Sequence, residues 1–155
     1  MSESVRFSAK KQIDGLQTTE QELLWTHESG INVLSYLDGV GGDYFIELKS
    51  CRDAYPPAFQ RQAFYDGYLH QVATYYMGLL KLNIDIPCFI IACEKTPPYS
   101  VSINKVGTGI LEELSHEGHY FISEFAEWLQ EPTRGDYQHW VPYLGYYDWS
   151  YLPKR

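Results

Sequence analysis

The stretch DGVGGDYFIELKS, residues 38–50, decides how the middle of this 155-residue chain folds. Its glycine-rich first half is typical of a tight turn, and its second half alternates like a strand. Side chains point alternately to the two faces of a strand, so Glu47 and Lys49 share one face. We expect the opposite face, with Ile46 and Leu48, to lie against the core.

Asp38 ends the preceding predicted strand, nine residues before Glu47. Antiparallel pairing across the turn would bring the two carboxylates close together. Two converging carboxylates beside a lysine are what Mg²⁺-dependent phosphodiester hydrolysis requires, since oxygen ligands hold the ion and the ammonium offsets developing charge. The alternative is a solvated Glu47–Lys49 pair on an exposed strand face, which is a common arrangement.

The remaining chain continues in segments separated by Gly and Pro. The expected strands are 21–25, 31–37, 44–49, 88–93 and 99–106, and the expected helices are 58–81 and 108–130. This order predicts an α/β fold with a mixed β-sheet, an antiparallel meander plus a central strand, flanked by helices. We expect one domain over 1–155, with a short N-terminal region 1–18 and an aromatic C-terminal tail 132–155.

Composition limits the class of protein. Hydrophobic residues at 45% and aromatic residues at 16% exclude intrinsic disorder. The formal net charge of −8 argues against a free-standing cationic nucleic-acid binder. No apolar run is long enough to cross a membrane, and no secretory signal is evident. Three scattered cysteines are typical of reduced thiols in a cytoplasm.

The first predicted helix carries Tyr68, Gln71 and Tyr75 on one stripe, so the three side chains can face one groove. The stripe is equally compatible with a glutamine at the edge of an aromatic core. Arg52 follows Lys49 by three residues and is a candidate for phosphate contacts, with a solvated charge as the simpler alternative.

The histidines give no metal signal along the sequence. His27 is isolated, and His116 and His119 are three residues apart without a cluster of Cys or His nearby. This spacing does not predict a zinc site. His70 points about 100° away from Gln71 on a helix, so we expect it at a surface or interface.

The segments EQELLW, YLDG, FIELKS and FYDGYLHQVATYYMG together resemble the phage-type exonuclease VIII (RecE-like) group of the PD-(D/E)XK nuclease superfamily. That group is related to lambda exonuclease and to the RecB nuclease domain. The resemblance runs from about Thr19 to the C-terminus and rests on Asp-x8-Glu-x-Lys followed by Tyr-x2-Gln-x3-Tyr. It implies a restriction-endonuclease-like core.

The resemblance also implies roles for individual residues. Asp38 and Glu47 would hold Mg²⁺, for which Mn²⁺ substitutes, with the Leu48 carbonyl as a further ligand. Glu20 matches an earlier acidic residue suited to a second metal. Lys49 matches the lysine that acts on the attacking water.

On the helix, Gln71 and Tyr75 match a motif that positions DNA, and Tyr68 matches the tyrosine before it. Two features depart from the family pattern. Relatives often have Arg-Pro-Asp where this chain has Tyr36-Leu37-Asp38, and they have helices before the Glu20 motif.

The function that follows is a Mg²⁺-dependent 5′→3′ exonuclease acting on duplex DNA ends in a phage-type recombination system. The implied partners are further copies of the chain in a ring-like homo-oligomer and a single-strand annealing protein. The implied location is the cytoplasm of a bacterium or a phage-infected host. Two alternatives remain: an endonuclease or repair nuclease using the same site, and a catalytically weak DNA-binding or assembly module with the same fold.

Overall fold

A computed structural model describes residues 3–130 of the chain, with side chains from residue 9 onward. Its elements are α1 (Glu3–Asp14), β1 (Leu16–Thr26), β2 (Asn32–Gly41), β3 (Phe45–Cys51), α2 (Pro56–Tyr65), α3 (Tyr68–Lys81), β4 (Cys88–Glu94), β5 (Val101–Val106) and α4 (Thr108–Gln130). The region 1–18, for which no element was predicted, contains α1 and the start of β1. The predicted aromatic tail 132–155 lies outside the described residues. No helix within the described residues is long and apolar enough to cross a membrane.

The five strands form one sheet in the order β1-β2-β3-β4-β5. Strands β1, β2 and β3 make the predicted antiparallel meander, β4 pairs with β3 in parallel, and β5 pairs with β4 antiparallel. The parallel pair needs a crossover connection, which α2 and α3 provide. The predicted class is therefore confirmed: an α/β fold with a mixed sheet flanked by helices.

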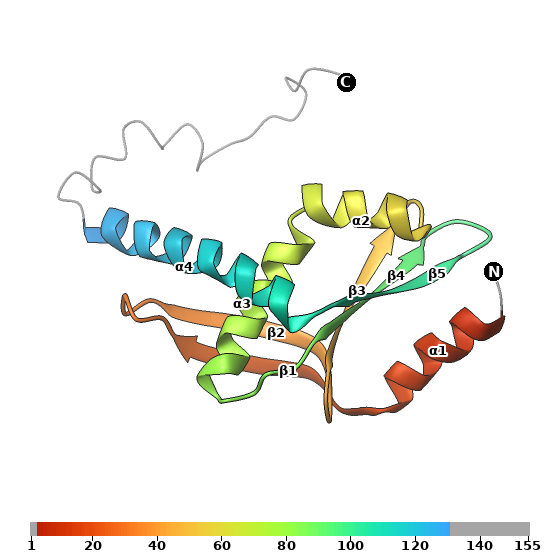
Figure 1. Ribbon diagram of the computed structural model, residues 1–155, viewed down its shortest axis with the longest axis horizontal. Helices are drawn as coiled ribbons and strands as arrows, with labels where there is room; N and C mark the ends of the chain where they lie inside the picture. The colour runs from red at the N-terminus through yellow and green to blue at the C-terminus, as the bar shows by residue number, and fades with distance from the viewer. Residues whose placement is uncertain (1–2, 131–155) are drawn as a thin grey trace, which may run out of the picture.

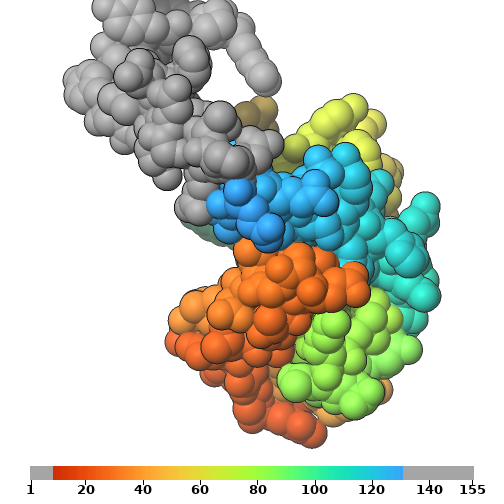
Figure 2. Space-filling view, turned by 90° about the vertical axis from the view of Figure 1, so that its left-hand side faces the viewer, coloured from red at the N-terminus to blue at the C-terminus, as the bar shows by residue number. Residues whose placement is uncertain are grey.

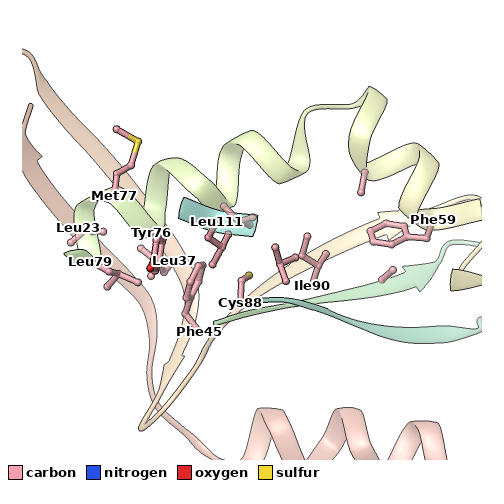
Figure 3. Close-up of a cluster of buried hydrophobic side chains, with 14 of the residues drawn as sticks. Leu23, Leu37, Phe45, Phe59, Tyr76, Met77, Leu79, Cys88, Ile90 and Leu111 are labelled. Atoms are coloured by element: carbon pink, nitrogen blue, oxygen red, sulfur yellow. The ribbon is translucent and has the colours of Figure 1, made fainter. Parts of the chain in front are cut away.

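Helices cover both faces of the sheet. In Figure 1, α2, α3 and α4 lie on one face, and α1 lies on the other. Under α2, α3 and α4 is the larger core, drawn in Figure 3, where side chains from the strands meet those of the helices. A smaller cluster beneath α1 contains Ala9, Ile46 and Ile91. Strand β3 thus contributes to a core on each of its faces.

The prediction that Ile46 and Leu48 lie against the core is right for Ile46, which is 1% exposed in the smaller cluster, and wrong for Leu48. Phe45 and Glu47 point to the larger core and are 0% and 3% exposed, whereas Leu48 on the opposite face is 48% exposed. The face that carries the carboxylate is therefore the one that the three helices cover. Alternation along β3 separates two faces but does not show which face receives the helices, because both faces carry apolar side chains.

The helix predicted over 58–81 is two helices. It breaks between Tyr65 and Tyr68, where the N–H of Asp66 donates to Gln62 O and the N–H of Gly67 donates to Phe64 O, which ends α2. Gly67 follows with φ of 73°, in the left-handed region that favours glycine. The break lets α3 run in its own direction across β1. There Gly78 packs directly against the Trp25 ring, with no room for a Cβ between them.

Candidate active site

Strand β2 leaves β3 at Asp38. The two strands pair only at Gly39–Ile46 and Val40–Phe45, so Asp38 is the next position in register and lies opposite Glu47. The Asp38 side chain replaces a backbone hydrogen bond between the two strands, because its Oδ2 accepts the N–H of Leu48 at 2.6 Å. In a strand the carbonyl of a residue points to the same edge as its N–H, so the Leu48 carbonyl also faces the Asp38 side.

Glu47 is a buried carboxylate in which one of the two oxygens accepts a hydrogen bond. Oε1 lies 3.2 Å from the Lys49 ammonium, while Oε2 is buried and has no hydrogen-bond partner among residues 9–130. The pKa of Glu47 is raised to about 7, chiefly by burial and then by the nearby Asp38 charge, with Lys49 acting in the opposite direction. Two adjacent carboxylates with one ammonium leave an excess of negative charge here.

Lys49 is held between Glu47 and an aromatic ring. Its side chain is 15% exposed, and Nζ lies 5.1 Å from the centre of the Tyr68 ring. Contact of an ammonium with an aromatic face is attractive and limits the positions the side chain can adopt. The first residue of α3 therefore touches the lysine of β3, as the predicted stripe requires.

The other two members of the stripe, Gln71 and Tyr75, are bonded to each other. Gln71 donates from Nε2 to the Tyr75 hydroxyl at 2.5 Å. Burial raises the pKa of Tyr75, the bond from Gln71 lowers it, and the charges of Glu47 and Asp38 raise it. Tyr75 is therefore close enough to both carboxylates to be affected by their charge, and Gln71 is bonded to Tyr75.

His70 points away from this group. Its Nε2 lies 3.0 Å from Glu117 Oε2 on α4, and its side chain is 41% exposed. The expectation of a surface histidine agrees with this position.

Arg52 directly follows β3 and lines a cavity of about 730 Å³. Tyr68 and Lys95 also line this cavity, as do Asp53 and Asp66. Because Tyr68 contacts Lys49, the cavity adjoins the carboxylate pair. The two cations give it a partly basic lining.

Lys95 was not assigned a role in the sequence. Its position follows from the parallel pairing of β3 and β4, in which Cys51 lies opposite Glu94 and the N–H of Lys95 donates to Cys51 O at 3.3 Å. Parallel strands end at the same edge of a sheet, so residues that follow them lie together. That rule would have pointed to Lys95 had the pairing been known.

Glu20 is the predicted site residue that the structure does not join to the others. It lies in β1 between the pairs Thr19–Gly39 and Gln21–Leu37, which puts it opposite Asp38 in register. Its side chain is exposed, its φ is 50°, and it forms no hydrogen bond or ion pair with the Asp38–Glu47 pair within residues 9–130. The three acidic residues thus share one row across the sheet, but only two of the side chains converge.

Comparisons with known proteins address the fold. No family model and no curated protein matches the chain. A crystal structure of a candidate exonuclease from Eubacterium rectale matches 79% of this chain with a TM-score of 0.61 and 16% sequence identity. This chain spans 50% of that protein. A crystal structure of a protein named SSO0001 matches 83% of this chain and 59% of its own, with 13% identity and a TM-score of 0.44, which is too low to support an argument.

The chain therefore shares its α/β fold with that candidate exonuclease, and at 16% identity the likeness concerns the fold alone.

Proposed function

We propose that this protein is a Mg²⁺-dependent deoxyribonuclease that digests duplex DNA from its ends in the 5′→3′ direction. The observation that carries the proposal is the buried Glu47 carboxylate, with one oxygen on Lys49, one oxygen unpaired, and Asp38 beside it. A solvated surface pair would be exposed and would leave no buried oxygen without a partner. The alternative of an exposed Glu47–Lys49 pair is therefore disfavoured.

The donor set fits a divalent cation. Asp38 and Glu47 offer carboxylate oxygens and Leu48 offers a carbonyl, and Mg²⁺ and Mn²⁺ prefer such oxygen ligands. The unpaired Oε2 of Glu47 gives the ion an atom that no protein group satisfies. When bound, the ion polarises a phosphoryl oxygen and lowers the pKa of a bound water. Glu20 is assigned an assisting role from its place in the same row of the sheet.

Lys49 supplies the cationic group of the reaction. Its ammonium is fixed by Glu47 Oε1 and by the Tyr68 ring, so it is held in one position beside the carboxylates. We assign to this ammonium the orientation of the attacking water and compensation of the charge that develops on the phosphate. Hydrolysis by water needs no covalent enzyme intermediate.

DNA contacts come from α3 and from the adjoining cavity. The Gln71–Tyr75 hydrogen bond holds two polar side chains of α3 together, and Tyr75 lies within electrostatic range of both carboxylates, so we assign the pair to positioning the scissile phosphate. Arg52 lines the cavity beyond Tyr68 and is assigned to backbone phosphates, because an exposed guanidinium binds phosphate oxygens well. Net charge does not oppose this proposal, since a bound Mg²⁺ reverses the local sign of the acidic site.

The finer part of the proposal rests on the resemblance to exonuclease VIII-type enzymes. It supports digestion from duplex ends, a ring-like homo-oligomer, cooperation with a single-strand annealing protein, a phage-type recombination system, and action in a bacterial or phage-infected cytoplasm. The neighbour described as a candidate exonuclease is compatible with the same activity.

Substitution at the carboxylate and the lysine tests the proposal. We expect Glu47→Gln and Lys49→Ala each to lower Mg²⁺-dependent digestion of linear duplex DNA at least ~100-fold, since each removes an electrostatic group of the reaction. Circular dichroism and melting temperature check that the variants fold. Glu22→Gln is the matched control, because Glu22 is an exposed carboxylate bonded only to Tyr36, and its activity should equal that of the wild type. Undiminished digestion by both site variants would refute the assignment.

The form of the DNA separates the exonuclease from the alternatives. Linear duplex should be degraded, and covalently closed circular duplex should stay intact under the same conditions. Cleavage of the closed circle would identify an endonuclease, and absence of cleavage of either substrate with Mg²⁺ or Mn²⁺ would favour the binding module. A label at the 5′ end that is released before a 3′ label would support the proposed polarity.

A further inference from the structure

The tip of the β1–β2 hairpin meets the middle of α4. His27 follows β1 directly and opens the turn, donating its N–H to Ile31 O at 2.8 Å and accepting the N–H of Gly30 at 2.9 Å. Figure 1 shows the hairpin running along α4, and the space-filling view in Figure 2 shows the two surfaces in contact. An imidazole from each side forms this contact.

Three metal-ligating side chains converge at the tip. Nε2 of His27 lies 2.8 Å from Nδ1 of His119, although the two residues are 92 positions apart in the chain. Oε1 of Glu28 lies 3.9 Å from the same Nδ1. One ligand atom from each of the three residues lies within 4.8 Å of the other two. The fold, and not local spacing, brings this His, Glu and His together.

The ring of His27 is fixed in place. It is 1% exposed, packs edge-on against Trp25 with ring centres 6.2 Å apart, and has Nδ1 2.7 Å from Ser29 Oγ. A histidine that binds a metal through one nitrogen almost always has a polar partner on the other, which orients the ring. His119 and Glu28 are 37% and 75% exposed, so the opposite side of the cluster is open to solvent.

We propose that His27, His119 and Glu28 bind one divalent ion of the Zn²⁺ class. This ion joins the β1–β2 hairpin to α4, and its site is separate from the Asp38–Glu47 site. Two imidazole nitrogens and a carboxylate oxygen are a ligand set that Zn²⁺ favours, with a fourth position left to water. Around tetrahedral Zn²⁺ two nitrogens lie roughly 3.3 Å apart, so the observed pair has to separate by about half an ångström. The partly exposed His119 and Glu28 can make that adjustment.

A proton is the competing occupant of the site. Without an ion, the N–H of Ser29 lies 3.1 Å from Nδ1 of His27, and the Nε2 proton of His27 bonds to His119. Binding of the ion at Nε2 moves that proton to Nδ1, where Ser29 Oγ accepts it and the N–H of Ser29 loses its acceptor.

The two proposed metal sites differ in place and in chemistry. His27 follows Glu20 by seven positions, and Glu20 lies opposite Asp38, so the span is roughly 23 Å in an extended strand. The Asp38–Glu47 site offers oxygen alone and suits Mg²⁺, whereas the hairpin site offers nitrogen and suits Zn²⁺. An ion at the hairpin tip closes the loop between residues 27 and 119, so it should stabilise the fold whether or not DNA is cleaved.

Calorimetric titration of the chelator-treated full chain with ZnCl₂ tests the proposal. Asp38→Asn serves as the background, so that binding at the carboxylate pair does not contribute. We expect one Zn²⁺ per chain, a rise in melting temperature with Zn²⁺ that Mg²⁺ does not produce, and Co²⁺ absorption typical of tetrahedral sites. His119→Gln should weaken Zn²⁺ binding at least ~100-fold, and exposed Glu28→Gln should weaken it about 10-fold, since even an outer partner is worth ~10–100-fold.

His116→Gln is the matched control, because His116 is exposed on the same helix, one turn before His119, and is not among the three ligands. Its Zn²⁺ affinity should equal that of the background. The proposal fails if the background binds no Zn²⁺, or if His119→Gln and Glu28→Gln bind it as tightly as the background. The first result would mean that the two histidines form a metal-free hydrogen bond.

Discussion

At the scale of single residues, the surroundings of Glu47 set the chemistry of the site. Its pKa rises to about 7 because the carboxylate is buried and has Asp38 beside it, and because Lys49 offsets only part of this effect. The alternation of residues 44–49 identified Glu47 and Lys49 as neighbours on one face. It did not reveal that this face is buried, since burial depends on helices that lie elsewhere in the chain.

Two adjacent tyrosines of α3 separate activity from stability. Tyr75 accepts from Gln71 in the site, while Tyr76 is 3% exposed and donates to Asp85 Oδ1 at 2.8 Å. We expect Tyr75→Phe to lower DNA digestion by on the order of 10-fold or more, through loss of positioning. Tyr76→Phe should leave digestion unchanged and lower the free energy of unfolding by about 1–2 kcal/mol, because it removes a hydrogen bond to a carboxylate.

Digestion assays and urea denaturation on the two variants check this contrast. A Tyr75→Phe protein with full activity would show that the Gln71–Tyr75 bond serves only the fold.

At the scale of elements, the break between α2 and α3 places the site residues of α3. Gly67 adopts φ of 73°, and the next residue, Tyr68, contacts Lys49. A continuous helix from residue 58 to 81 would give α3 the direction of α2. The apolar periodicity continues through the break, because both helices bury a face against the same sheet, and this continuity hid the break from the sequence pattern.

Two glycines test the role of this backbone conformation. An added Cβ has open space at both Gly67 and Gly109, but only Gly67 has positive φ. We expect Gly67→Ala to lower the free energy of unfolding by about 1–2 kcal/mol, the cost of a left-handed conformation for a residue with a Cβ. Gly109→Ala, in the first turn of α4, should be neutral or stabilising by up to ~1 kcal/mol.

Urea denaturation measures both values. Equal effects of the two substitutions would mean that the left-handed conformation at residue 67 is not what makes glycine necessary there.

At the scale of the whole molecule, sheet topology assembles the site from distant segments. The parallel pairing of β3 with β4 puts Lys95 next to the end of β3, near Arg52 in the cavity. The departure of β2 from β3 releases the Asp38 carboxylate. Both features depend on which strands pair and where the pairing stops. Both also bring charged side chains close together, and the interactions between these charges affect the stability of the fold.

The pH dependence of stability follows from Glu47. Its pKa is raised from 4.5 to about 7, so the folded protein holds this proton more tightly than the unfolded chain. The stabilisation is complete below about pH 4.5 and is lost as pH rises through about 7. We expect the metal-free wild type to lose on the order of 3 kcal/mol relative to Glu47→Gln between about pH 5 and about pH 8.

Urea denaturation of both proteins in chelator measures the difference, and the variant removes contributions from other titrating groups. Added Mg²⁺ should reduce the loss, because the ion favours the ionised carboxylate. A constant difference between the two proteins across this pH range would contradict the assigned burial of Glu47.

By itself, the sequence determined the α/β class, the mixed sheet with its meander, the bounds of α4, and the neighbouring positions of Glu47 and Lys49. These follow from alternation, helical period and turn residues, which act over a few residues. Only the tertiary structure decided that the carboxylate face is buried, that Glu20 stays apart, that Lys95 joins the cavity, and that His27 meets His119. Each of these depends on contacts between segments far apart in the chain, and local pattern carries no information on which segments will meet.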